Sequence, residues 1–160
     1  ARGKQVGWVM LRELAEIVKR RDPDFVVGGR ADPYLLRWWI IPRNRWFNIY
    51  LHEFRRSDDD RALHDHMYLN LSILLDGEYV EHGIQQGGVR THVLRKAGDW
   101  VVRLPSRAHR IELLGRRTTT LFITGPRVRQ WGFHCPNGWV HWKKFVDERD
   151  SGAIGKGCDQ

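Results

Sequence analysis

The chain has 160 residues, of which 41% are hydrophobic and 29% charged, and a formal net charge of +8 from 27 Lys and Arg against 19 Asp and Glu. This length suits one domain with a real core, and the 8 Trp, 6 Phe and 4 Tyr argue against a disordered chain. No run approaches the roughly 18 apolar residues that a membrane helix needs, so we expect no membrane association.

The first predicted element is a helix over residues 8–20. Apolar residues recur near helical spacing at Val9, Met10, Leu14, Ile17 and Val18. The Asp22-Pro23 pair ends this helix, because proline disfavours a helical conformation in the residue before it. Residues 1–30 are therefore expected to form a helix and a connector that pack on the domain that follows.

Short strand-like runs occupy residues 31–150, and Gly, Pro, Asp and Asn separate them. In chain order they read YLLRWWIIP, WFNIYLHEF, MYLNLSILL, GEYVEHG, VRTHVLR, DWVVRLP, HRIELL and TTTLFITGP. This spacing predicts an antiparallel sandwich or barrel, and RQWGFHCPNGWVHWKKFV adds one more strand or a covering segment. Residues 151–160 contain too little apolar surface to fold alone and are expected to be a mobile tail. We expect one domain overall.

The chain has two cysteines, Cys135 and Cys158, which do not make a disulfide framework. This predicts a reducing, cytoplasmic environment. Cys135 is expected to be a small buried side chain, and a reactive thiol is the alternative.

Residues 61–83, RALHDHMYLNLSILLDGEYVEHG, carry the strongest chemical signal. In a strand, alternate side chains share a face. One face would then be polar, with His64, His66, Tyr68, Asn70 and Ser72. Two imidazoles on one face of a barrel strand could grip a cation, whereas an accidental pair at a strand entrance is the alternative. A third histidine, His109, follows a glycine turn, a strand and a proline in AGDWVVRLPSRAHRIEL.

This arrangement resembles the first motif of the cupin superfamily, small β-barrels of the jelly-roll type. That motif is Gly, five residues, His-x-His, three or four residues, Glu, six residues and Gly. The chain has His64-x-His66, then Asn70 and Gly77 at the last two positions.

The second cupin motif is Gly, five to seven residues, Pro-x-Gly, two residues, His, three residues and Asn. Gly98, Pro105 and His109 match it in part. The stretches SDDDRALHDH, LFITGPRVRQWGFHCP and GW are also similar to uncharacterised bacterial and prophage-borne cupin-like proteins.

The resemblance implies an all-β fold, a cupin-type jelly-roll β-barrel with an N-terminal α-helix, and it implies that His64, His66 and His109 are metal ligands. Three neutral imidazoles leave coordination positions open, as in catalytic rather than structural metal sites. Cupins with three-histidine iron centres include thiol and diketone-cleaving dioxygenases. The resemblance therefore favours Fe(II), with Zn, Ni and Mn as alternatives.

The chain departs from the family pattern at several positions. Asp58 stands at the first motif glycine, Asn70 replaces the usual Glu ligand, Arg107 lies near the second Pro-x-Gly glycine, and Leu113 replaces the final Asn. A 2-oxoglutarate oxygenase is less favoured, because its metal site keeps a carboxylate and Asp65 should face away from the two histidines.

Two residues of the polar face are catalytic candidates. Tyr68 is a proton donor or substrate contact, or else a barrel-lining aromatic, and Asn70 is placed to hydrogen-bond a bound water or substrate. Arg103 and Arg107 are substrate-binding candidates, since a guanidinium pairs two-fold with a carboxylate; a surface role is the alternative for both. His52 is either a partner of a ligand histidine or a plain strand residue.

Two further histidines, His82 and His92, flank GIQQGG, which is typical of a hairpin loop, and both are expected to be exposed. The surplus positive charge is scattered over separate loops and strands, without a basic helix, zinc-finger spacing or RNA-binding signature. A small molecule is therefore the favoured partner, and nucleic acid is not.

The leading hypothesis is a metal-dependent oxygenase that acts on a small, anionic substrate. A non-catalytic module that binds a small ligand or nucleic acid is the second hypothesis, and isomerase or hydrolase chemistry with Zn, Ni or Mn is the third. The resemblance also allows a homodimer.

Overall fold

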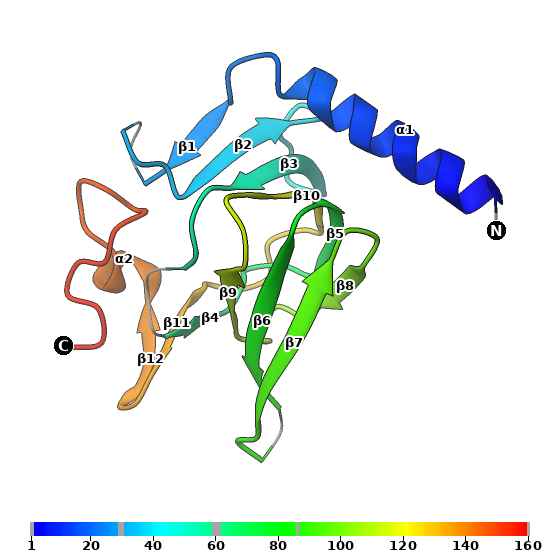
Figure 1. Cartoon of the computed structure of the whole chain (residues 1–160). Coiled ribbons are helices and arrows are strands. Elements are labelled where there is room, and N and C mark those ends of the chain that lie inside the picture. The colour runs from blue at the N-terminus through cyan, green and yellow to red at the C-terminus, as the bar shows by residue number, and fades with distance from the viewer. Residues whose placement is uncertain (1, 29–30, 59–61, 86, 160) are drawn as a thin grey trace.

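The computed structural model describes residues 2–28, 31–58, 62–85 and 87–159, with side chains from residue 7 onward (Figure 1). Its elements are α1 (Arg2–Val18), β1 (Phe25–Val27), β2 (Leu35–Trp39), β3 (Asn48–Phe54), β4 (Leu63–His64), β5 (Asn70–Asp76), β6 (Glu78–Ile84), β7 (Arg90–Lys96), β8 (Trp100–Arg103), β9 (His109–Leu113), β10 (Thr118–Thr124), β11 (Gly132–Cys135), β12 (Gly138–His141) and α2 (Trp142–Phe145).

The strands form two six-stranded antiparallel sheets. The first has the order β1-β2-β3-β10-β5-β8 and the second β12-β11-β4-β9-β6-β7. At the centre of each sheet, strands from distant parts of the chain lie side by side, as β3, β10 and β5 do in the first and β11, β4, β9 and β6 in the second. This is the pattern of a jelly roll, so the predicted β-barrel with an N-terminal helix is confirmed. The strand β1 lies within the segment expected to be a connector, and the aromatic segment after residue 130 forms the hairpin β11–β12 and the short helix α2.

The central strands of the first sheet, β3 and β10, are mostly buried on both faces. The helix α1 lies along its outer face, where Ala15 packs with Trp38 and Leu51 (Figure 1). An ion pair ties the end of the helix to the same face, with Lys19 Nζ 3.1 Å from Glu53 Oε2. Because α1 covers the outward side chains, nearly every residue of β3 is buried, and its inward side chains are free to line the barrel.

The space between the sheets holds a second apolar cluster. Leu35, Phe54 and Leu74 of the first sheet meet Tyr79 and Ile111 of the second. Full burial of such side chains stabilises a fold by about 1.5–3 kcal/mol each. This cluster holds the two sheets together around the interior.

The two motif glycines occupy turns that favour glycine. Gly77 joins β5 to β6 with φ +81°, and Gly98 joins β7 to β8 with φ +102°. Side chains rarely adopt this left-handed region, and a Cβ at Gly77 would also meet the backbone of Arg117. Both glycines are therefore explained by the turns that connect barrel strands.

The C-terminal segment corrects two expectations. Cys135 and Cys158 form a disulfide, so the interpretation of both as free thiols is wrong, and the argument from cysteine content for a reducing cytoplasm falls with it. The tail is also not free: the backbone N–H groups of Gly155 and Gly157 donate to the carbonyl of Phe145. The described part of the tail therefore folds back on β11, β12 and α2.

Loss of the disulfide should destabilise the protein. Closure of a loop with a sequence separation of 23 stabilises a fold by about 3 kcal/mol, mainly through the entropy of the unfolded chain. We expect Cys158→Ser to lower the free energy of unfolding by about this amount in urea denaturation. A reductant should destabilise wild type equally and leave Cys158→Ser unchanged. An identical urea midpoint for oxidised wild type and Cys158→Ser would contradict the pairing.

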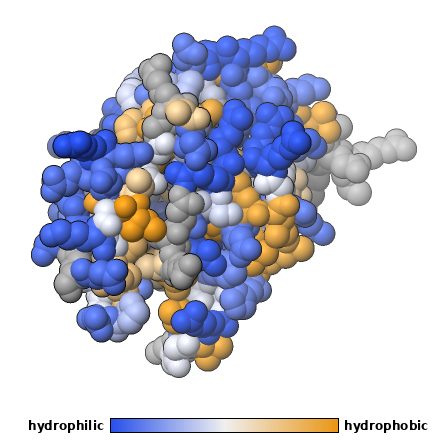
Figure 2. All heavy atoms as spheres, turned by 60° about the vertical axis from the view of Figure 1, so that its left-hand side comes forward, coloured by the Kyte–Doolittle hydropathy of each residue, from blue (hydrophilic) through white to orange (hydrophobic). Residues whose placement is uncertain are grey.

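The surface facing the viewer in Figure 2 is mostly hydrophilic, with apolar side chains in smaller groups among the charged ones. Within the described part of the chain, no helix has the length and apolar character of a membrane span.

Candidate metal centre

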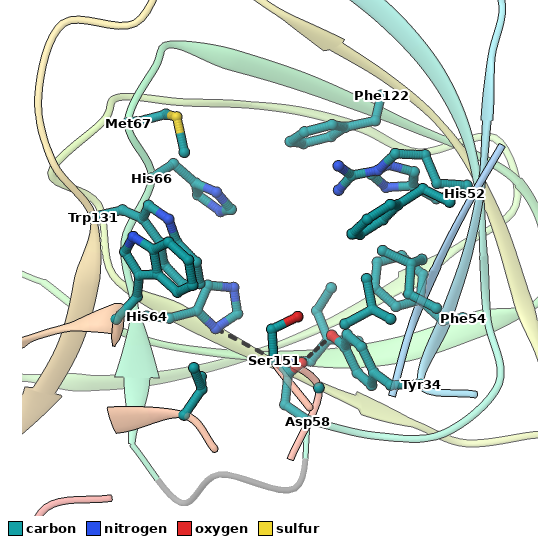
Figure 3. Close-up of a pocket in the computed structure, with 18 of the residues that line it drawn as sticks. Tyr34, His52, Phe54, Asp58, His64, His66, Met67, Phe122, Trp131 and Ser151 are labelled. Carbon is teal, nitrogen blue, oxygen red and sulfur yellow. Dashed lines mark hydrogen bonds and ion pairs between the residues drawn. The ribbon is translucent and has the colours of Figure 1, made fainter. Parts of the chain in front are cut away.

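Three histidines from different parts of the chain converge at one wall of the barrel. One ring nitrogen from each of His64, His66 and His109 lies within 4.8 Å of those of the other two, and Nε2 of His66 is 2.8 Å from Nε2 of His109. His64 of β4 and His109 of β9 are directly paired across neighbouring strands. Figure 3 shows His64 and His66 pointing into the pocket from one side, with His52 and Phe122 facing them from the other.

The segment between His64 and Asn70 is not the continuous strand that the sequence predicts. The chain leaves the second sheet after His64 and enters the first at Asn70. Along this crossing His66 and Tyr68 both line the pocket with His64, and Met67 between them lines it too, so the strict alternation of a strand is lost after His66.

Asp65 fixes this crossing from the opposite side. Its side chain is fully buried and faces away from the two histidines, as expected. The carboxylate accepts hydrogen bonds from Arg129, at 2.7 Å, and from the backbone N–H of Gly132 and the indole of Trp139. The β11–β12 hairpin thus anchors the residue between the two histidines, which directs both imidazoles into the pocket.

Carboxylates lie behind two of the three histidines. Glu81 Oε1 is 3.2 Å from Nδ1 of His109, and Asp58 Oδ2 is 3.8 Å from Nδ1 of His64 (Figure 3). Metal-binding histidines typically have such a partner at the far ring nitrogen, which sets the tautomer and the ring orientation. Asp58 is itself held, because it accepts hydrogen bonds from the Tyr34 hydroxyl and the backbone N–H of Ile111.

Burial keeps the imidazoles of His66 and His109 neutral. It lowers the pKa of His109 to about 4, with a further lowering by the Arg103 guanidinium, and it lowers the pKa of His66 well below the usual range. Burial alone would raise the pKa of Glu81, but the hydrogen bond from His109 and the charge of Arg103 hold that pKa far below its ordinary value. Neutral imidazoles beside an ionised carboxylate are the protonation states that a metal requires.

The same burial makes the metal-free protein sensitive to acid. The pKa of His109 is about 4 in the fold against 6.5 for the free side chain, so the unfolded chain binds one more proton between these pH values. Stability should therefore fall as pH drops through this window, by about 3 kcal/mol from His109 alone.

His52 and His66, whose pKa values burial also lowers, add to this loss in the same direction. Urea denaturation of chelator-treated protein at several pH values measures the effect. His109→Gln, which cannot titrate, should show a shallower dependence, whereas equal slopes for the two proteins would contradict the assignment.

The histidines open onto a cavity of about 520 Å³ between the two sheets. Its walls are mainly aromatic and include Tyr34, Trp39, Phe54, Phe122, Trp131, Phe133, Trp142 and Phe145. Residues 151–154 of the tail complete the wall, and Figure 3 shows Ser151 beside the pocket. The tail that the sequence analysis expected to be mobile is thus part of the pocket.

The predicted site residues have different placements. Tyr68 lines the pocket, and its ring stacks on that of His66. Arg103 also reaches the pocket, but it is almost fully buried: its Nε donates to Glu81 at 2.6 Å and its Nη2 to the Tyr79 hydroxyl. The main contacts of Arg103 therefore hold Glu81 behind His109.

The other two predicted residues lie away from the cavity. Asn70 is buried and is not among the residues that line the pocket, so a contact with a bound water or substrate there finds no support. Arg107 is exposed and is also outside the pocket lining. Asn70 and Arg107 therefore do not share the pocket with the three histidines.

Arg37 is the main pocket residue that sequence reasoning missed. It lines the cavity, its Nε donates to Nε2 of His52 at 2.8 Å, and its guanidinium lies over the ring of Tyr50. Burial lowers the pKa of Arg37, and within the described residues no carboxylate pairs with it. The missed signal is an arginine at an inward position of YLLRWWIIP, between Leu35 and Trp39 on the same face.

The donor set fits a divalent transition metal. Neutral imidazole nitrogen is a common ligand of Fe, Zn, Ni and Cu, and the three nitrogen atoms lie close enough to share one ion. Among the described residues, these are the only three His, Cys, Asp or Glu side chains grouped in this way. No carboxylate joins them, so water or a ligand could complete the coordination.

Comparison with known proteins supports the fold. No family model and no curated protein matches the sequence. Among solved structures, Fe(II) HppE in complex with substrate has a TM-score of 0.52 at 11% identity over 66% of this chain and 57% of that one. Oxalate decarboxylase from Bacillus subtilis, in a study of its Mn(II) centres, also has a TM-score of 0.52, at 14% identity over 72% of this chain and 30% of that one.

A cupin superfamily protein from Desulfitobacterium hafniense DCB-2 has a TM-score of 0.48 at 19% identity, over 62% of this chain and 84% of that one. The chain thus spans about half or less of the HppE and oxalate decarboxylase chains, and identities this low support the fold and not an activity. With its two antiparallel sheets of jelly-roll type, the chain has a cupin-type β-barrel fold.

Proposed function

We propose that the protein is a metal-binding cupin that acts as an Fe(II)-dependent oxygenase on a small anionic molecule. The convergence of His64, His66 and His109 at the wall of a partly open pocket rich in aromatic side chains carries this proposal. A bound Fe(II) would supply a Lewis acid with open coordination positions for substrate and dioxygen. The protein side chains would hold, orient and shield the reactants.

His66 and His109 present lone pairs without a competing proton. Their neutral state follows from the lowered pKa values of His66 and His109. Glu81 and Asp58 lie 3.2 Å and 3.8 Å from the far nitrogens of His109 and His64, where their negative charge favours a proton on those nitrogens and leaves the others to face the pocket. This prior orientation reduces the entropy lost when the site assembles.

The substrate would bind between the histidines and Arg37. A half-buried guanidinium without a carboxylate partner is only partly hydrated, and an anionic group on the substrate would offset the cost through paired hydrogen bonds. Arg43 lines the same pocket and adds positive potential. The aromatic walls suit an apolar body and exclude water, so we propose a carboxylate with a flat or apolar remainder.

Tyr68 would serve as the proton donor of the site. Burial raises the pKa of its phenol, which keeps Oη protonated at neutral pH. The ring stacks on His66, which places the side chain beside the metal ligands. A group at this position can hydrogen-bond substrate and hold a proton during the reaction.

Two other functions are open to the same fold. Fe(II) and Mn(II) both occur in the matched structures, and a redox-inert metal at the same histidines would favour isomerase or hydrolase chemistry. A non-catalytic module that binds a small ligand or nucleic acid would need no metal.

Metal analysis together with oxygen consumption separates these functions. Purified protein loaded anaerobically with Fe(II) should consume oxygen when supplied with compounds from a panel of small carboxylates, and should convert none of them without oxygen. Turnover with Zn, Ni or Mn under anaerobic conditions would overturn the oxygenase in favour of an isomerase or hydrolase. Metal-free protein with tight, salt-sensitive DNA binding would overturn both.

A further inference from the structure

A second group of histidines lies outside the barrel. His82 of β6 and His92 of β7 are directly paired across neighbouring strands, and Glu112 of β9 lies on the other side of His82. The sequence analysis expected both histidines beside a loop and exposed; the structure places them within strands, with His92 exposed and His82 half-buried. They face away from the pocket, because their neighbours Glu81 and His109 point inward.

The three side chains form a chain of short polar contacts. Nδ1 of His82 is 2.7 Å from Nδ1 of His92, and Nε2 of His82 is 2.6 Å from Glu112 Oε2. A carboxylate at Nε2 favours the tautomer of His82 that carries its proton there and leaves the Nδ1 lone pair free. His92 can present a second lone pair once its proton moves to Nε2, which faces solvent.

We propose that His82 and His92 form a surface site for a divalent transition metal, with Glu112 as the positioning residue behind His82. Two imidazoles on adjacent strands are chelating ligands whose backbone is already fixed, so little entropy is lost on binding. Water would complete the coordination. This proposal does not depend on the function proposed for the barrel interior.

The nitrogen separation favours one geometry. With metal–nitrogen bonds of about 2.0 Å, nitrogens 2.7 Å apart subtend about 85° at the ion, close to the right angle of tetragonal Cu(II) and Ni(II). A tetrahedral Zn(II) would need the nitrogens about 3.3 Å apart and larger rotations of both rings. We therefore infer a preference for Cu(II) over Ni(II) and Zn(II), which the general affinity order for divalent metals reinforces.

One neighbouring charge opposes the cation. Arg110 Nη2 lies 3.9 Å from Glu112 Oε2 and shares that carboxylate with His82. The contact of Glu112 with His82 is much shorter, at 2.6 Å. Replacement of Arg110 by Gln removes this positive charge and keeps the contact of Glu112 with His82, so it should tighten metal binding at the surface site.

Cu(II) titration of the purified chain, followed by calorimetry and electron paramagnetic resonance, tests the site. The barrel site is removed first by the double replacement His66→Ala and His109→Ala, which leaves His64 as its single imidazole, so that the remaining two-nitrogen signal reports the surface site alone. In this background we expect one Cu(II) per chain with coupling to two nitrogens. His82→Ala and His92→Ala should each abolish the two-nitrogen signal, and Glu112→Gln should weaken binding by about tenfold.

His141→Ala, which removes another histidine outside the pocket, is the matched control and should bind Cu(II) as the background does. His92→Gln guards against misfolding, since His92 is exposed and its replacement leaves the core untouched. Retention of the two-nitrogen signal in both His92 variants would overturn the proposal, as would an equal loss in His141→Ala. If the wild-type barrel bound no metal, the Cu(II) signal expected from His82 and His92 would be unchanged. That outcome would count against the proposed oxygenase and not against the surface site.

Discussion

Replacement of His109 by Ala should reduce bound Fe(II) from about one ion per chain to almost none. His109 is buried and supplies one of three ring nitrogens within 4.8 Å of one another. Loss of a carboxylate behind a ligand histidine already weakens metal binding by about 10–100-fold, so loss of a ligand itself should cost at least about 100-fold. Elemental analysis after anaerobic loading and desalting measures the ratio of iron to protein.

His64→Ala should give the same loss of iron, because His64 supplies another of the three ring nitrogens. Its ring is less buried than that of His109, so its removal should disturb the fold less. His141→Ala, outside the pocket, should keep the wild-type iron content. Circular dichroism should show each variant folded, which separates loss of a ligand from loss of the protein. Full iron content in either pocket variant would contradict the assignment of that histidine.

Replacement of Arg37 by Gln should weaken carboxylate binding without loss of metal. A buried charge-assisted pair contributes about 1.5–3 kcal/mol, which corresponds to roughly 10–100-fold in affinity. Calorimetry with benzoate, which has a ring and a carboxylate, and with benzyl alcohol, which has the ring and a neutral hydroxymethyl group, separates charge from apolar packing. Only the benzoate affinity should fall in Arg37→Gln.

Arg107→Gln is the matched control, since Arg107 is exposed and outside the pocket lining. It should bind benzoate as wild type does. A benzoate affinity that is equal in wild type and Arg37→Gln would remove Arg37 from the substrate site. Because iron content is measured on the same samples, that outcome would leave the metal centre intact.

Part of this site could be predicted from local sequence. His64 and His66 share a face because alternate residues of an extended chain do so, although this alternation ends within the crossing, where Met67 also lines the pocket. His109 could be placed only through the spacing of the cupin motifs, since nothing local indicates that β9 lies beside β4. Where the extended chain changes sheets, at Asn70, the expected pocket position was wrong.

The remaining site residues depend on long-range packing. The inward position of Arg37 could not be predicted, because α1 covers the outer face of its sheet and β2 therefore carries apolar residues on both faces. Without an alternation of polar and apolar residues, the sequence does not indicate which face of the strand is inside. Glu81 could not be linked to His109 before β6 was paired with β9. The disulfide depended on the return of the tail to β11, which residue composition does not indicate.

The position of a bound ion tests the metal centre most directly. Crystals of the protein loaded anaerobically with Fe(II), measured with X-rays above the iron absorption edge, should give one strong anomalous peak inside the barrel. We expect this peak about 2.0–2.2 Å from one ring nitrogen of each of His64, His66 and His109. An iron-loaded crystal whose only peak lies elsewhere, or in which any of the three imidazoles points away from the ion, would contradict the account.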